Sequence, residues 1–313
     1  MELRRVGVTG LRVSELGLGT MTWGRETDDL DAAEQVRDFL DAGGNLIDTA
    51  ASYGDGEAES VIGTLLGGKV SRGEVVLATK AGTRRDASRR TLLDALDASL
   101  RRMGTDHVDL FLVACPDGAT PLAETASALR LAVTSGKARY AGVCNHPGWA
   151  TARLASLVGD DAGLAAVSCE YSLVQRGVER EILPAAHELG LGLLAWSPLG
   201  RGVLTGKYRH GTPADSRAAS SHMAGFVQPY LEGPASSVVD AVGIAADGLG
   251  RSPAEVALSW LLEREQVASA IVGARTPAQL RTTLAATELA LPAEVLSALD
   301  DVSAPPVGYP ERW

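Results

Sequence analysis

The strongest constraint on the fold is a regular alternation between short apolar segments and segments with helical periodicity. Eight short apolar segments occur along the chain, and nearly all are followed by a stretch whose apolar residues recur every three or four positions. Such alternation predicts parallel strands joined by right-handed crossover helices. With eight units we predict a closed (β/α)8 TIM barrel of the α/β class. The predicted strands are 16–19, 46–47, 75–80, 108–113, 140–143, 165–169, 191–196 and 270–272.

The rest of the chain fits one barrel domain spanning 1–313. An open doubly wound sheet would need a glycine-rich dinucleotide fingerprint after an early strand, and the nearest match, at 190–195, precedes its strand. Residues 6–13 predict a β-hairpin with Gly10 in the turn. The long irregular segment 208–234, after the seventh strand, predicts either a lid or binding loop or a surface excursion. The predicted helices are 30–42, 57–66, 90–103, 122–134, 149–157, 179–189, 236–248, 253–264, 277–286 and 292–299.

The bulk composition excludes several classes of partner. The 313 residues are 45% hydrophobic and carry a formal net charge of −10, which argues against nucleic acid or an anionic membrane surface. No signal-peptide pattern follows Met1, and no stretch approaches the roughly 20 apolar residues of a membrane span. Cys115, Cys144 and Cys169 lie far apart and lack metal-ligand spacing, so we predict no metal site. An odd number of cysteines whose spacing suggests no disulfide is typical of the reducing cytosol, so we predict a cytoplasmic protein.

Polar residues at the ends of the predicted strands are the candidate functional residues, because the active sites of such barrels lie at the carboxyl ends of the strands. Histidines elsewhere are weaker candidates. His107 and His187 are interpreted as structural or surface residues, whereas His210 and His222 in the long segment are open to either interpretation. The strand-end candidates are Asp48, Lys80, Asp117, Asn145, Glu170, Ser197 and Arg275.

Asp48 and Tyr53 form the most suggestive pair. Asp48 ends a short buried strand, and Tyr53 follows it in a loop that contains Gly54 and Gly56. The structural alternative is that Asp48 caps the next helix and that Tyr53 is a half-buried loop aromatic. If the barrel brings Lys80 beside them, its charge would pair with Asp48 and lower the pKa of Tyr53 from about 10. A tyrosine tuned in this way is a general acid for a developing alkoxide.

From end to end, the chain resembles the aldo-keto reductase superfamily. The resemblance implies a barrel that binds NADP(H) in an extended pose and transfers hydride to a carbonyl carbon. Of the family's Asp, Tyr, Lys and His tetrad, it implies Asp48, Tyr53 and Lys80, with Tyr53 as proton donor. The matching pieces, specific in their order and spacing, are 16–20, 48–50 with 53–54, 79–80, 108–111, 136–137 with 142–143, 196–207 and 272–277.

The resemblance also implies a set of residues that hold the cofactor. Trp196 falls where the family stacks an aromatic ring on the nicotinamide, and Asn145 falls where it binds the carboxamide. Residues 197–199 with Lys207 correspond to the pyrophosphate site. Arg275 with its neighbours corresponds to the site of the adenosine 2′-phosphate, which a guanidinium suits bidentately; the alternative is a solvated loop arginine. The full set is Thr20, Asn145, Ser168, Trp196, Ser197, Pro198, Leu199, Lys207, Gly273, Arg275, Thr276 and Gln279.

The reacting end of the predicted site departs from the family pattern at three positions. Ala114 occupies the histidine position, Cys144 replaces a serine, and Ser168 stands where a glutamine usually binds the carboxamide. Alanine cannot donate a hydrogen bond to a substrate oxygen, and loss of one such donor typically costs about 10²–10³ in rate. Relatives that lack this histidine include steroid double-bond reductases, with Glu there, and potassium-channel β subunits, with Asn.

Three functions are compatible with these residues. The first is an NADPH-dependent oxidoreductase that reduces the carbonyl of a small molecule, with Tyr53 as its acid. The second is a reductase of a conjugated C=C or C=N bond, which needs a carbonyl-orienting imidazole less. The third is an NADP(H)-binding sensor or regulatory subunit with little turnover. Asp48, Tyr53 and Lys80 favour an enzyme, whereas Ala114 favours the second or third function.

Overall fold

Eight parallel strands close into a barrel, which confirms the predicted fold class. In the computed structural model the order around the barrel is β10-β3-β4-β5-β6-β7-β8-β9, so sequential strands are neighbours and the last pairs with the first. The model describes residues 1–159, 163–209, 211–214, 216–220, 223–231, 233, 235–306 and 308–309. The barrel strands are β3 (Leu16–Gly19), β4 (Leu46–Asp48), β5 (Val76–Ala81), β6 (Val108–Val113), β7 (Ala138–Cys144), β8 (Leu164–Glu170), β9 (Gly192–Trp196) and β10 (Val267–Val272).

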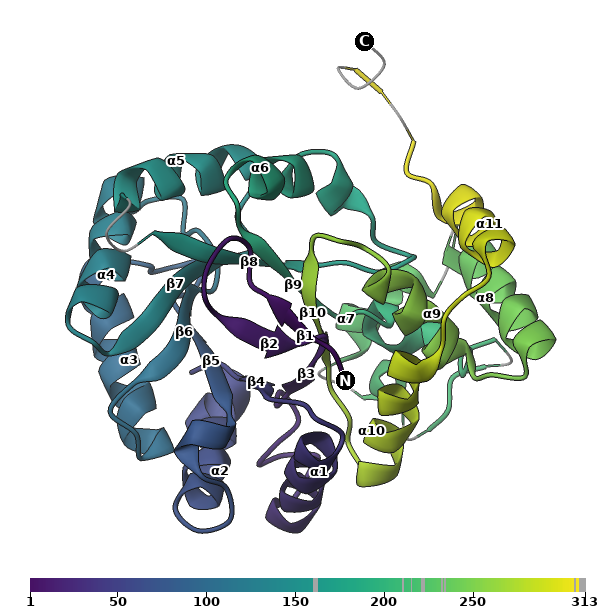
Figure 1. Cartoon of the computed structure of the whole chain (residues 1–313), viewed down its shortest axis with the longest axis horizontal. Coiled ribbons are helices and arrows are strands. Elements are labelled where there is room, and N and C mark those ends of the chain that lie inside the picture. The colour runs from purple at the N-terminus through teal and green to yellow at the C-terminus, as the bar shows by residue number, and fades with distance from the viewer. Residues whose placement is uncertain are drawn as a thin grey trace.

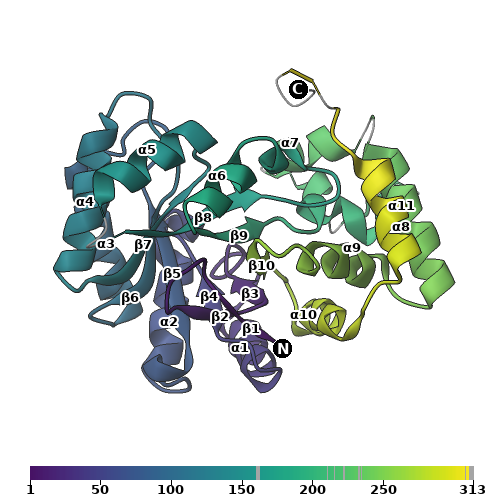
Figure 2. The ribbon, with the colours of Figure 1, turned by 45° about the horizontal axis from the view of Figure 1, so that its top comes forward.

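Helices surround the barrel, and α1 to α6 follow one another in an arc around its strands (Figure 1). Helices α8 and α11 lie side by side at the edge of the molecule opposite α3 and α4 in both views (Figure 2). Helix α6 starts later than predicted because Pro184 has no N–H to donate and is tolerated only in the first helical turn. The helices are α1 (Asp29–Asp41), α2 (Glu57–Leu66), α3 (Arg89–Met103), α4 (Leu122–Thr134), α5 (Gly148–Val158), α6 (Ile182–Glu188), α8 (Ala235–Leu249), α9 (Pro253–Leu262), α10 (Pro277–Leu284) and α11 (Ala293–Ser303).

The predicted N-terminal hairpin exists, but its strands lie further from the turn than predicted. Strands β1 (Leu3–Arg5) and β2 (Arg12–Ser14) pair antiparallel, and the connection between them contains Gly10. Val6 and Leu11 lie just beyond the two strands, where the Val6 N–H still donates to the Leu11 carbonyl at 2.9 Å. Their side chains pack with interior residues of the barrel strands. The hairpin therefore closes the amino-terminal end of the barrel and leaves the opposite end for a site.

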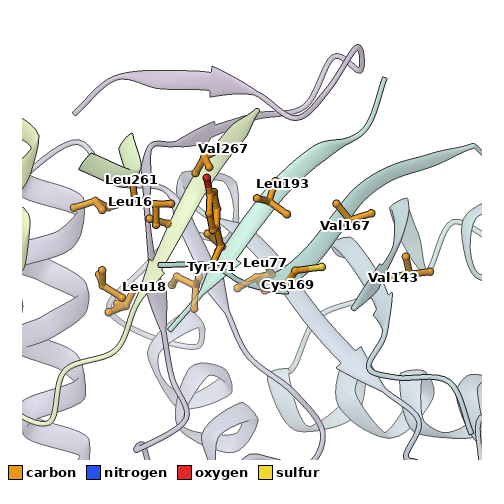
Figure 3. Packing of buried hydrophobic residues seen from close by; sticks show 14 of the residues in the cluster. Leu16, Leu18, Leu77, Val143, Val167, Cys169, Tyr171, Leu193, Leu261 and Val267 are labelled. Carbon is orange, nitrogen blue, oxygen red and sulfur yellow. The ribbon is translucent and has the colours of Figure 1, made fainter. Parts of the chain in front are cut away.

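The hydrophobic core has two parts, separated by the barrel wall. The outer part packs strand residues against the helices, and Figure 3 shows several of them, among them Leu77 and Val143. The inner part contains Leu46, Ala78 and Leu110 together with the hairpin. Because successive side chains of a strand point to opposite faces, most of the barrel strands contribute to both parts. On β5 this alternation places Lys80 inside the barrel, on the same face as Ala78.

The long segment after the seventh barrel strand, β9, contains more secondary structure than predicted. Its described residues include the short helix α7 (Ala224–Val227) and the 3₁₀ turns η5 (Arg217–Ala219) and η6 (Gln228–Tyr230). The segment is attached to the barrel mouth, since Arg201 Nη1 donates to the Phe226 carbonyl at 2.5 Å. His210 and His222 lie outside the described residues. Within the described ranges, the helices all lack the combination of length and apolarity that crossing a membrane requires.

Candidate active site

A cavity of about 580 Å³ opens at the carboxyl ends of the barrel strands. Its volume is that of a typical small-molecule or cofactor site. The cavity gathers residues that are far apart in the sequence, from the loops after six of the barrel strands and from the long segment. Predicted site residues on its wall are Asp48, Tyr53, Lys80, Asn145, Trp196, Ser197, Pro198, Leu199, Lys207, Gly273, Arg275 and Gln279.

Asp48 and Lys80 form a buried ion pair at the base of the cavity. Neighbouring strands β4 and β5 carry them, with Asp48 opposite Ala78 in the register. Lys80 Nζ donates to Asp48 Oδ2 at 2.6 Å and to the Thr49 carbonyl at 2.8 Å. The Lys80 ammonium also lies 5.2 Å from the centre of the Tyr53 ring. The structure thus brings the three predicted residues together, which excludes the alternative in which Asp48 merely caps a helix.

The electrostatics of this group keep Lys80 charged. Burial lowers the pKa of Lys80, but the Asp48 carboxylate more than offsets that effect, so the pKa is raised above its usual value. Burial raises the pKa of Asp48, and the Lys80 charge opposes that rise. An ammonium that is held by two oxygens and kept protonated is a fixed positive charge beside the phenol.

The predicted direction of the Tyr53 pKa is wrong for this structure. Lys80 does lower the pKa of Tyr53, as predicted, but burial raises it by more, and the net shift is upward. The physical reason is that desolvation penalises the phenolate more strongly than one nearby ammonium, itself paired with Asp48, can compensate. Tyr53 is therefore a neutral phenol with a proton to donate.

Asn145 and Trp196 form the next part of the cavity wall, beside Ala114. Trp196 Nε1 donates to Asn145 Oδ1 at 3.2 Å, and Asn145 Nδ2 donates to the Ala114 carbonyl at 3.0 Å. Asn145 has a φ of 58° and Ser197 a φ of 51°, conformations that cost energy in residues other than glycine. Strained backbone at two strand ends that face one cavity is typical of a functional site.

The far end of the cavity is rich in positive charge. Arg275 and Gln279 come from the loop after β10 and the first turn of α10, and the Arg275 backbone N–H donates to Gln279 Oε1 at 3.0 Å. Lys207 and Arg217 line the same cavity, and Arg217 lies near Arg275. Burial lowers the pKa of Arg217, and the nearby Arg275 charge adds to that effect. A helix N-terminus with several cationic side chains is a ready anion site.

Comparison with known proteins identifies the family of the chain. A family model described as the aldo/keto reductase family matches residues 15–304. The chain belongs to this family. It is 35% identical to an uncharacterized oxidoreductase, YrpG, of Bacillus subtilis (strain 168), an alignment that covers 100% of this chain and 99% of the relative. It is 34% identical to L-glyceraldehyde 3-phosphate reductase of Escherichia coli O157:H7, over 96% of this chain and 92% of the relative.

The relatives also include a protein of a different kind. The chain is 33% identical to a probable voltage-gated potassium channel subunit beta of Oryza sativa subsp. japonica, over 100% of this chain and 98% of the relative. Aldo/keto reductases generally use nicotinamide cofactors and act on small molecules. The matched family and the oxidoreductase relatives make this chain an oxidoreductase of that type.

Three residues predicted to hold the cofactor of an aldo/keto reductase are not on the cavity wall. Thr20 is buried, and its hydroxyl donates to the Asp48 carbonyl at 3.2 Å. Ser168 is buried in β8, where its backbone carbonyl accepts from the Asn145 N–H at 3.0 Å. Thr276 is the N-cap of α10, and its side chain accepts from the Gln279 N–H at 3.3 Å. In this structure all three support residues that do line the cavity.

Among the residues of the cavity wall that sequence reasoning missed are Arg201, Arg217 and Phe226. Arg201 Nε and Nη2 donate to the Glu170 carboxylate at 2.7 and 2.5 Å, and its guanidinium lies 3.9 Å from the centre of the Phe226 ring. Arg201 lies inside the 196–207 motif, and that position in the sequence could have identified it as a site residue. Arg217 and Phe226 lie in the long segment, where residue spacing predicts no structure. Asp117, in contrast, caps a loop through the N–H groups of Ala119 and Thr120.

Proposed function

We propose that the protein is an NADPH-dependent reductase of a small-molecule carbonyl, with Tyr53 as the proton donor. The observation that carries this proposal is the buried Asp48–Lys80 pair held against Tyr53 in the cavity. A binding protein has no chemical need for a paired lysine that keeps its charge beside a protonated phenol. A reductase needs that arrangement, because its acid must give a proton to an oxygen on which negative charge develops.

The residues of the cavity fit NADP(H). Asp48 Oδ1 is buried and has no hydrogen-bond partner among the described residues, so it is available to a ligand hydroxyl. At the other end Arg275, Arg217 and Lys207 suit phosphate groups, and the two guanidiniums favour NADPH over NADH. Trp196 and Asn145, between these ends, would hold the nicotinamide. When bound, the reduced cofactor would supply the hydride.

The residues of the chain would then act on the substrate oxygen. Tyr53 would donate its phenolic proton to that oxygen as the carbonyl carbon becomes tetrahedral. Negative charge would appear on the phenol in the same step, and the Lys80 ammonium would stabilise it. Because this interaction grows as the charge develops, it belongs mainly to the transition state. Asp48 would keep Lys80 in place and charged throughout.

A second candidate function is reduction of a conjugated C=C or C=N bond. The observation that favours it is Ala114, whose methyl group lines the cavity where an imidazole would donate to the substrate oxygen. A third, a sensor or regulatory subunit, is favoured by the similarity to the probable channel subunit beta. Loss of turnover would leave Asp48, Lys80 and Tyr53 without a role, and we rank the sensor below the two enzymes.

A single-turnover experiment distinguishes the three functions. NADPH bound to the protein is mixed with 2-cyclohexen-1-one or with 4-nitrobenzaldehyde, and the loss of nicotinamide absorbance is followed. We expect the enone to yield the unsaturated alcohol, which is the product of carbonyl reduction. Cyclohexanone as the main product would instead establish C=C reduction. Bound NADPH that survives both compounds and a wider panel of aldehydes and ketones would favour the sensor.

A further inference from the structure

A buried ion pair lies behind the catalytic strand, outside the cavity. Glu59 on α2 has 0% of its side chain exposed, and its partner in the pair is Arg102 on α3. Glu59 Oε1 accepts from Thr79 Oγ1 at 2.6 Å, and Glu59 Oε2 accepts from Arg102 Nε at 2.8 Å and Nη2 at 2.5 Å. The three residues come from α2, β5 and α3, so this network joins three elements that follow one another in the chain.

On one side the network holds the strand that carries Lys80. Thr79 immediately precedes Lys80 in β5. Since side chains alternate across a strand, Thr79 points outward to the helices while Lys80 points into the barrel. A hydrogen bond on the outer side therefore limits the rotation of the strand about its axis. That rotation determines where the Lys80 ammonium lies.

On the other side the network holds the turn that carries Tyr53. The turn η1 (Tyr53–Gly56) leads directly into α2, and Glu59 is the third residue of that helix. Gly56 has a φ of +98°, and a Cβ atom there would lie 2.7 Å from Arg102 Nε, so the guanidinium packs on the backbone of the turn. The network thus connects the turn of Tyr53 to the strand of Lys80 from outside the barrel.

Stability alone does not explain charged residues at this position. Apolar residues of similar volume often replace a buried ion pair with no loss of stability, or with a gain. Here Arg102 donates from two nitrogens to Glu59 Oε2 while Thr79 donates to Oε1, so the carboxylate is held in one orientation. We propose that Glu59, Arg102 and Thr79 are positioning residues that set the distance between Tyr53 and Lys80. This inference rests on the proposed function for the roles of those two residues.

The opposite end of the same strand offers a matched control. Asp109 Oδ2 accepts from the Leu77 N–H at 2.8 Å and from Arg72 Nη2 at 2.7 Å. This second arginine–carboxylate pair also holds β5, but at the end remote from the cavity. If the two pairs serve stability alone, changes to either should have the same consequences for activity.

The experiment compares Thr79→Val, Thr79→Ser and Asp109→Asn with the wild type. Thr79→Val keeps the shape of the side chain but removes the hydroxyl that Glu59 accepts from, and Thr79→Ser retains that hydroxyl. We measure kcat and KM with an aldehyde, the Kd of NADPH by fluorescence, the melting temperature, and the Tyr53–Lys80 distance in crystals of each variant. Arg102→Lys, which keeps the charge but loses the fork, is the second variant if Thr79→Val does not fold.

We expect Thr79→Val to lower kcat about tenfold or more, because a misplacement of about 1 Å can cost as much as 10²-fold. The Kd of NADPH should stay within about twofold. The crystals should show Lys80 displaced relative to Tyr53, whereas Thr79→Ser and Asp109→Asn should resemble the wild type. Equal losses of kcat in Thr79→Val and Asp109→Asn would overturn the proposal, as would an unchanged Tyr53–Lys80 distance in Thr79→Val. The distance is informative even if the wild type shows no turnover, which would refute only the proposed function.

Discussion

The two ends of the cavity are built from different parts of the barrel. At the reacting end the strands themselves carry Asp48 and Lys80, which are only 3% and 7% exposed, and the turn η1 after β4 carries Tyr53. The phosphate end uses loops and a helix N-terminus, where Arg275 is half-buried and Gln279 is exposed. Charges at the first end are buried and paired by the protein, so their positions are set before any ligand arrives. Charges at the second end are more solvated, and they suit a ligand that brings its own negative charge.

The largest expected effect tests the reacting end. We predict that Tyr53→Phe lowers kcat by about 10²–10⁴-fold, the usual contribution of a general acid, while the Kd of NADPH stays nearly the same. The measurement is steady-state reduction together with cofactor fluorescence. Tyr140→Phe is the control, because Tyr140 packs with the inner core near the hairpin. A Tyr53→Phe protein that keeps more than about a tenth of the wild-type kcat does not use this phenol as its acid.

A smaller effect is expected from restoring the missing donor. We predict that wild-type protein reduces nitrobenzaldehydes poorly and that Ala114→His raises kcat/KM for them. The gain should be about 1–3 kcal/mol, or roughly 5- to 150-fold, because an imidazole can donate to the developing oxyanion. Cys144, next to the site, offers the ring's second nitrogen little support, which limits the gain. On a bulky natural substrate the same change should lower activity by filling its space.

The Ala114→His result depends on one control. NADPH must bind the variant as tightly as it binds the wild type, which fluorescence titration measures. With that control satisfied, a variant no faster on aldehydes than the wild type would mean that Ala114 is not at the histidine position, or that another group already serves the substrate oxygen.

Substitutions at the phosphate end of the cavity should change the affinity for the cofactor instead of kcat. We predict that Arg275→Ala weakens NADPH binding about tenfold and leaves NADH binding nearly unchanged, because a hydrogen-bonded contact to a charged group contributes about 1.5–3 kcal/mol before screening by solvent. Arg281→Ala, on the helix α10 that follows Arg275, is the matched control, since Arg281 pairs with Glu34 and Asp38 on α1. If Arg275→Ala weakens the binding of NADPH and NADH equally, Arg275 does not contact the 2′-phosphate.

The smallest expected effect is the pH dependence of the reacting end. Burial raises the pKa of Tyr53, so the phenol stays protonated through neutral pH. We therefore predict that kcat for reduction varies less than about twofold between pH 6 and 9 and declines only above the ordinary tyrosine pKa of about 10. A decline near pH 7–8 would show that the Lys80 charge outweighs burial when ligands are bound. Stopped-flow rates of reduction measured from pH 6 to above pH 10 distinguish these two outcomes.

The amino-acid sequence by itself determined the barrel. The chain has eight apolar segments, each short enough for one strand, and nearly all are followed by a helix. Eight such units fit a closed barrel. Most predicted boundaries of the strands and helices agree with the structure. Local pattern also made Asp48, Tyr53 and Lys80 candidates, because polar residues at strand ends and in the loops beyond them are where the chemistry of such barrels lies, and the family resemblance suggested their roles. Such features are readable because they depend on neighbours a few positions away in the chain.

Only the tertiary structure decided how these residues interact. The distance from Lys80 to Tyr53, and the balance between burial and charge that raises the Tyr53 pKa, depend on atoms from separate strands and loops. Arg217 reaches the cavity from a segment without periodicity. Nothing in the spacing around Glu59 distinguishes it from other acidic residues of helices, and only the fold places Thr79 and Arg102 against it. Electrostatic free energies depend on distance and solvation in three dimensions, and residue spacing along a chain contains neither.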